Sequence, residues 1–155
     1  GNGSTIEAGD LQYMSAGSGV HHSEYNPSAE NRTHMYQVWL RPDEKGGEPR
    51  YAEKRLGDSA VPNALTLLFS GDGRDGSTAI RQNAEIAFGH IDAGNALEVA
   101  ADADRPHAWL QVISGNVSVL GQELSTADGL AIENEPGAFE IRASADAKFL
   151  LFRLS

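Results

Sequence analysis

The chain has 155 residues, of which 40% are hydrophobic, 7% aromatic and 22% charged. This length suits one ordinary domain, or one small complete barrel with part of another, and the composition is typical of a soluble globular protein. Twelve Lys and Arg against 22 Asp and Glu give a net charge of −10, which argues against binding to nucleic-acid phosphates or anionic membranes. There is no cysteine, so any metal ion must be held by His, Asp or Glu.

The start of the chain has no element before it. It begins at Gly1 on the turn-like sequence Gly1-Asn2-Gly3-Ser4, so we expect a cut through something larger, or a processing or tag scar. No leader with a charged and then an apolar region is present, and no apolar run approaches the roughly 20 residues that cross a bilayer. These observations predict a cytoplasmic protein.

The richest cluster of potential metal ligands is His21, His22 and Glu24. If this segment is an extended strand, residues 22 and 24 point to one side, about 6.6 Å apart along the chain, and residues 21 and 23 point to the other. A glutamate can lean back, so His22 and Glu24 could share one metal ion. These donors suit Fe(II), Mn(II), Ni(II), Cu(II) or Zn(II). The alternative is a solvent-facing polar end of a strand.

The other histidines are weaker candidates for metal binding. His34 lies in the run 34–40, whose alternate residues could face a core, so a packing role is expected. His90 and His107 are isolated, which favours structural or exposed positions. No nucleophile elbow, phosphate loop or dinucleotide-binding glycine turn is found.

The segment from Pro42 to Pro49 is the most linker-like part of the chain, because its composition cannot bury anything. It divides the chain into residues 1–41, the remnant of one unit, residues 42–62, a connector, and residues 63–155, a nearly self-sufficient β-barrel.

Short apolar runs punctuated by 17 glycines and six prolines predict an all-β chain. The runs from residue 63 onward recur about every ten residues, as in a sandwich or small barrel. Only residues 96–103 have appreciable helix propensity. Turns are expected at 71–76, at 92–95 and at 114–116, the last as a hairpin. The predicted strands are 65–69, 86–91, 109–113, 117–120, 139–144 and 149–154.

Residues 9–24, G-D-L-Q-Y-M-S-A-G-S-G-V-H-H-S-E, resemble the signature of the pirin family, bicupin proteins whose first barrel holds a metal. The sequences Y-N-P-S at 25–28 and H-M-Y-Q-V-W-L-R-P at 34–42 are similar to bacterial pirin-like quercetin 2,3-dioxygenases, and residues 108–117 and 149–152 resemble their second barrel. The resemblance implies cupin-type β-barrels, the first incomplete (residues 1–41, the N-terminal cupin) and the second nearly complete (residues 63–155, the C-terminal cupin).

In that family a metal ion, usually iron, is held by three histidines and one glutamate. The resemblance places two of these metal ligands at His22 and Glu24, and gives Glu24 a catalytic role in taking the substrate proton. It implies opening of a flavonol such as quercetin with O₂ and Fe(II). The other two ligands form a His-x-His strand that this sequence lacks, so the chain looks like a pirin-like protein without roughly its N-terminal third. We therefore expect the isolated chain to be inactive or nearly so.

Two further expectations concern partners. Residues 1–41 should expose strand edges and an apolar face, which favours a homo-oligomer formed through the incomplete barrel. The competing function is a non-catalytic cupin binding module or regulator that contacts a protein partner. Tight stoichiometric metal that depends on His22 and Glu24 would favour the enzyme, and a metal-free protein that still binds a partner would favour the module.

Overall fold

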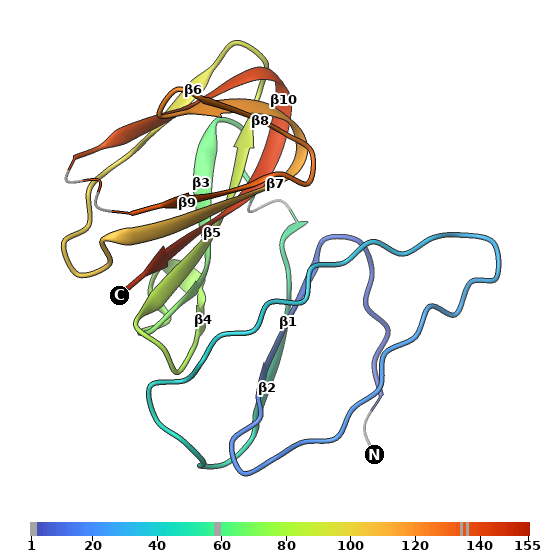
Figure 1. Ribbon diagram of the computed structural model, residues 1–155. Coiled ribbons are helices and arrows are strands. Elements are labelled where there is room, and N and C mark those ends of the chain that lie inside the picture. The colour runs from blue at the N-terminus through green and yellow to red at the C-terminus, as the bar shows by residue number, and fades with distance from the viewer. Residues whose placement is uncertain (1–2, 58–59, 134, 136) are drawn as a thin grey trace.

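The computed structural model describes residues 3–57, 60–133, 135 and 137–155 (Figure 1). Ten strands and one short 3₁₀ turn, η2 (Arg74–Gly76), make up the regular structure of these residues, which confirms the all-β prediction. No helix in this described part of the chain is long and apolar enough to cross a membrane. The strands are β1 (Asp10–Ser15), β2 (Arg50–Arg55), β3 (Ala64–Ser70), β4 (Thr78–Ala79), β5 (Ala84–Ile91), β6 (Ala96–Val99), β7 (His107–Val119), β8 (Gln122–Ser125), β9 (Gly129–Ile132) and β10 (Phe139–Leu154).

Eight of these strands, β3 to β10, form one bent sheet, which we call the barrel. Its central strand is β10, which is 16 residues long. One edge of β10 pairs antiparallel with β7, and its other edge pairs with β6 in its first half and with β5 in its second half. β3 continues the sheet beyond β5, and β8 and β9 both pair with β7. The predicted strands 65–69 and 86–91 are confirmed as β3 and β5.

The predicted hairpin at residues 114–116 is wrong. β7 runs without a turn through Gly115, and the chain bends there instead, opposite a series of register shifts in β10 between Ala143 and Phe149. Gly115 has φ +85°, and a Cβ at this position would lie 2.1 Å from the carbonyl oxygen of Asp146. A glycine is therefore needed because the bulged strands approach too closely for a side chain. Residues 139–144 and 149–154, which were predicted as two strands, likewise belong to one strand, β10, which continues through these register shifts.

The strand β6 contradicts the helix propensity of residues 96–103. Val99 is 1% exposed, and β6 pairs with the first half of β10. The gain from backbone pairing and from burying Val99 outweighs a weak local preference for helix.

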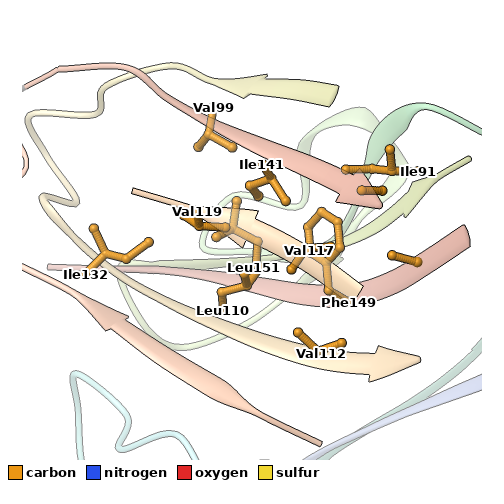
Figure 2. Close-up of a cluster of buried hydrophobic side chains, with 12 residues drawn as sticks. Ile91, Val99, Leu110, Val112, Val117, Val119, Ile132, Ile141, Phe149 and Leu151 are labelled. Atoms are coloured by element: carbon orange, nitrogen blue, oxygen red, sulfur yellow. The ribbon is translucent and has the colours of Figure 1, made fainter. Parts of the chain in front are cut away.

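The hydrophobic core fills the space between the two halves of the bent sheet (Figure 2). β10 supplies it with the alternation expected from the sequence, since Ile141, Ala143, Ala147, Phe149 and Leu151 are buried while Glu140 and Arg142 are exposed. The second half of β10 is also partly covered on its other face, where Phe152 is 7% exposed and Leu150 is half-buried. On the other face of the sheet the indole of Trp109 packs over Gly129, where a Cβ would lie 2.3 Å from it.

A network of charged side chains joins β5 to the segment before β7 and to β10. Arg105 makes ion pairs with Glu85 at 2.6 Å and with Asp102 at 2.8 Å, and Arg153 lies 3.9 Å from Asp102. Arg74 also pairs with Glu85, whose side chain is 11% exposed. Each of the two carboxylates thus has two guanidinium partners, as burial of a charge requires.

β1 and β2 form a separate two-stranded antiparallel ribbon in full register from Asp10↔Arg55 to Ser15↔Arg50. One face of the ribbon meets the large sheet: the ring of Tyr13 lies 6.3 Å from that of Phe69, and Lys54 donates a hydrogen bond to the carbonyl of Gly76. β2 lies inside residues 42–62, the predicted connector, and pairs with a strand of residues 1–41.

Gly89 provides a test of the core. It is paired with Phe149 of the neighbouring strand β10, whose ring lies over it. A Cβ at Gly89 would lie 2.1 to 2.6 Å from three ring atoms of this fully buried phenylalanine. Gly89→Ala should lower the free energy of unfolding by about 1–3 kcal/mol, because the ring has no space to retreat. Gly137→Ala is the control, since among the described residues its Cβ would meet Glu135 alone, at 3.7 Å. Equal stabilities of the two variants in urea unfolding would contradict this packing.

Asp102 provides a test of the charged network. Burial favours its neutral form, but the Arg105 guanidinium and hydrogen bonds from the backbone of residues 104 and 105 outweigh burial, so the pKa of Asp102 lies below its ordinary value. Its ionised form therefore stabilises the fold above about pH 4, and this contribution is lost as pH falls through the lower folded-state pKa. Asp102→Asn should cost about 1–3 kcal/mol at pH 7 and flatten the acid side of the stability profile.

Urea unfolding between pH 2.5 and 7 measures both effects of Asp102→Asn. Glu140→Gln is the matched control, because the Glu140–Arg142 pair is more than half exposed. If Asp102→Asn and Glu140→Gln gave the same pH profile, the network would contribute nothing to acid stability.

Candidate metal centre

His22 and Glu24 lie in a long loop, residues 16–49, that the β1–β2 ribbon closes at its base. Beyond the last pair of the ribbon, the amide of Ser18 donates to the carbonyl of Gly47 at 2.8 Å. Gly17 has φ +53°, and a Cβ there would lie 2.4 Å from the same carbonyl oxygen. The two ends of the loop are thus in direct backbone contact, and only glycine allows that contact.

Side chains of the barrel bind the C-terminal end of the loop. Arg81 donates to the carbonyls of Gly46 at 3.2 Å and Glu48 at 2.9 Å, and Gln82 donates to the carbonyl of Arg41 at 2.7 Å. The segment 42–49 is exposed, as its linker-like composition predicted, yet side chains from the barrel hold its backbone. In Figure 1 the remainder of the loop, drawn in blue and cyan, extends away from the barrel.

Within this loop the two predicted ligands approach each other. His22 Nε2 lies 4.0 Å from Glu24 Oε1, with the side chains 42% and 33% exposed. The other carboxylate oxygen, Glu24 Oε2, accepts a hydrogen bond from Gln37 Nε2 at 3.4 Å, and Trp39 Nε1 donates to Gln37 Oε1 at 3.3 Å. An imidazole and a carboxylate therefore face each other, and one oxygen of the carboxylate is already engaged.

The local structure around these residues differs from the expected strands. Residues 20–24 and 34–40 have no regular secondary structure, so the strand on which the expected geometry of His22 and Glu24 was conditional does not form, although their side chains do turn to the same side. The packing role predicted for His34 is wrong, because the residue is exposed, with its ring centre 5.0 Å from that of Tyr36. Strand pairing needs a neighbour, and none of the described residues pairs with these segments.

The remaining histidines do not join the pair. His90 lies on β5 with its Nε2 3.7 Å from Asp92, and His107 is exposed at the start of β7. Among the residues that the structure describes, no three His, Asp or Glu side chains come together as a group that could hold a metal ion. Within the described residues, His22 and Glu24 therefore remain a pair of potential donors, fewer than the three or more protein ligands that a catalytic metal usually has.

The loop exposes apolar surface, as expected for residues 1–41. Tyr25 is 84% and Trp39 87% exposed. Such large side chains in contact with water are unusual when they gather in one segment. The other exposed apolar side chains of this region are Ile6, Val20, Met35, Tyr36 and Val38.

A hollow lies between the ribbon and the barrel. It is an open hollow of about 490 Å³ whose walls include Arg55, Phe88, His90 and Lys148. The charge of Arg55 is matched by Glu7 at 2.6 Å and by Asp10 at 2.9 Å. With a single histidine and an acidic residue that is already paired, the hollow offers no ligand set for a metal ion.

The bent eight-stranded sheet and its core define an all-β protein of the cupin class, and comparison with known families agrees. Residues 67–154 match the quercetinase C-terminal cupin domain, and residues 1–40 match the family Pirin. The chain belongs to the pirin family.

Three comparisons show how much of the relatives this chain represents. It is 42% identical to quercetin 2,3-dioxygenase of Escherichia coli (strain K12) over 156 residues, which cover 99% of this chain and 64% of the relative. The crystal structure of YhhW from Escherichia coli superimposes with a TM-score of 0.92 at 41% identity over 100% of this chain and 64% of its own. The nickel(II) complex of bacterial pirin YhhW gives 0.91 at 40% identity, covering 99% and 65%. The chain thus spans slightly less than two thirds of these relatives.

Sequence reasoning did not single out Gln37 and Trp39 as neighbours of the ligand pair. A signal is nevertheless present, because residues 37 and 39 have the same spacing as residues 22 and 24. In an extended backbone this spacing places two side chains on one side. The contact between the two pairs depends on how the loop folds back on itself, which the local pattern does not contain.

A substitution at Gly17 tests whether the backbone contact between the two ends of the loop keeps the loop closed. Gly17→Ala should open the base of the loop, because its Cβ would collide with the backbone of residues 47–49. Hydrogen exchange at the Ser18 amide should then accelerate by at least tenfold. Gly46→Ala is the control: Gly46 also has positive φ, +76°, but no atom of the described residues lies within 4 Å of its Cβ position. Equal acceleration in both variants would show that backbone conformation matters and contact does not.

Proposed function

We propose that this chain is part of a metal-dependent dioxygenase of the quercetin 2,3-dioxygenase type, in which His22 and Glu24 bind a divalent transition metal, Fe(II) in the physiological enzyme. The observation that carries the proposal is the 4.0 Å approach of His22 Nε2 to Glu24 Oε1 on a loop with closed ends. Two relatives support it: a protein named quercetin 2,3-dioxygenase, 42% identical, and a solved nickel(II) complex, 40% identical.

The donor set fits part of such a site. Imidazole and carboxylate without sulfur suit Fe(II), Ni(II) and related ions, and a small closing movement brings both donors within bonding distance of one ion. A catalytic metal usually has three or more protein ligands, whereas the described residues supply two. On this proposal the remaining ligands, two histidines of a three-histidine, one-glutamate site, lie outside the described residues.

The residues of this chain have separate tasks in the proposed reaction. When bound, the metal ion supplies Lewis acidity toward the hydroxyl group of a flavonol and brings it together with O₂. His22 binds through a neutral ring nitrogen. Glu24 adds negative charge beside it and accepts the proton of the flavonol hydroxyl. Both side chains are partly exposed, which leaves a substrate access to them.

The 155-residue chain alone should not catalyse flavonol opening, because two protein ligands hold a transition metal too weakly for turnover. After anaerobic loading with Fe(II), the loss of quercetin absorbance in air should equal that of free Fe(II). Robust turnover above this background would show that two ligands from this chain suffice.

In the protein as its gene encodes it, His22→Ala and Glu24→Ala should each lower Ni(II) affinity by more than tenfold in calorimetry, because each removes one ligand. His107→Ala, which removes an exposed histidine of the barrel, should bind Ni(II) like the wild type. Wild-type protein without a stoichiometric metal site would contradict the proposal and favour the non-catalytic binding module.

A further inference from the structure

We infer that Gln37 is a positioning residue for Glu24: its amide holds one carboxylate oxygen, so that the other is left as the metal ligand, and Trp39 holds the amide in the orientation that this requires. The inference rests on the proposed metal site at His22 and Glu24 and goes beyond it, because neither Gln37 nor Trp39 is among the metal ligands.

The two oxygens of Glu24 have different surroundings. Oε1 is the one that lies 4.0 Å from His22 Nε2, and Oε2 accepts the hydrogen bond from Gln37 Nε2 at 3.4 Å. A carboxylate can bind a metal through one oxygen or through both. An N–H donor on Oε2 favours the first mode, because binding through both oxygens would require Oε2 to turn away from the amide. Gln37 therefore selects Oε1 as the ligand atom.

Trp39 decides which end of the Gln37 amide faces Glu24. The indole nitrogen is a donor only, and Trp39 Nε1 donates to Gln37 Oε1 at 3.3 Å. The amide oxygen must therefore point to the indole, and the NH₂ group must point to the carboxylate. The reversed amide would place two donors against each other at Trp39 and two acceptors against each other at Glu24, and both contacts would be lost.

The chain of contacts also crosses the loop. Glu24 and Gln37 are 13 positions apart in the sequence. Their hydrogen bond therefore joins the segment that carries the two ligands to the later segment of the loop that contains Gln37 and Trp39. Without this tie a carboxylate that is one third exposed is free to rotate in solvent. Partners of this kind typically change metal affinity by 10 to 100-fold when they are removed.

The test uses the protein as its gene encodes it, with Ni(II) alone as the probe. Calorimetry measures Ni(II) affinity, and X-ray absorption at the nickel edge reports whether a carboxylate is bound through one oxygen or two. Gln37→Leu keeps the approximate size and removes both polar atoms. Trp39→Phe keeps an aromatic ring and removes the indole N–H. Gln122→Leu is the matched control, because Gln122 is an exposed glutamine on β8 of the barrel.

We expect Gln37→Leu to weaken Ni(II) binding about tenfold and to convert the carboxylate to binding through both oxygens. Trp39→Phe should give a smaller loss in the same direction, and Gln122→Leu no change. Thermal unfolding of the metal-free proteins should be the same for wild type and Gln37→Leu, which separates positioning from folding.

Two results would overturn the inference in different ways. If Glu24→Ala abolishes Ni(II) binding while Gln37→Leu leaves affinity and coordination unchanged, the metal site stands and Gln37 has no positioning role. If wild type and Glu24→Ala bind Ni(II) equally, the proposed metal site itself is wrong, and the inference about Gln37 is wrong with it.

Discussion

The candidate site depends on the pairing of β1 with β2. These two short strands close residues 16–49 into a loop, and closing a long loop costs conformational entropy that the ribbon and its contacts must offset. Because successive side chains alternate between faces, the register of this ribbon also decides which residues meet the barrel. A slip of β1 by one residue would turn Tyr13 away from Phe69, and the same slip of β2 would turn Lys54 away from Gly76, so either would remove a contact that supports the loop.

The strands of the barrel can be predicted from the sequence wherever a local pattern of apolar and polar residues marks them. The alternation in residues 139–144 and the doubly apolar run 149–154 predict which positions of β10 are buried, because each strand face meets a different environment. Gly115 shows the limit of such reasoning. A Gly-Asn step suits a tight turn and a bulge equally well, and the choice here is made by the backbone of Asp146 in a distant strand. β6 is a similar case, because pairing with β10 overrides its helix propensity.

The loop was harder to predict, because little of its structure is regular. The spacing of His22 and Glu24 was enough to suggest that their side chains meet, even though the strand that justified the suggestion is absent from the described residues. The contacts of Gln37 with Glu24 and of Arg81 with Gly46 and Glu48 join segments with no common pattern. Such contacts arise only when the whole loop is folded, so local sequence reasoning does not find them.

The two tryptophans of the chain sit in contrasting surroundings, one in the loop and one on the barrel. Trp39 is 87% exposed beside Gln37, whereas Trp109 is 40% exposed and its indole is covered on one side by Gly129. An indole in water fluoresces at longer wavelength and is reached by soluble quenchers such as acrylamide more readily than a shielded one. The tryptophan fluorescence of this chain is therefore the sum of two optical signals, and selective quenching separates motion of the loop from melting of the barrel without any added label.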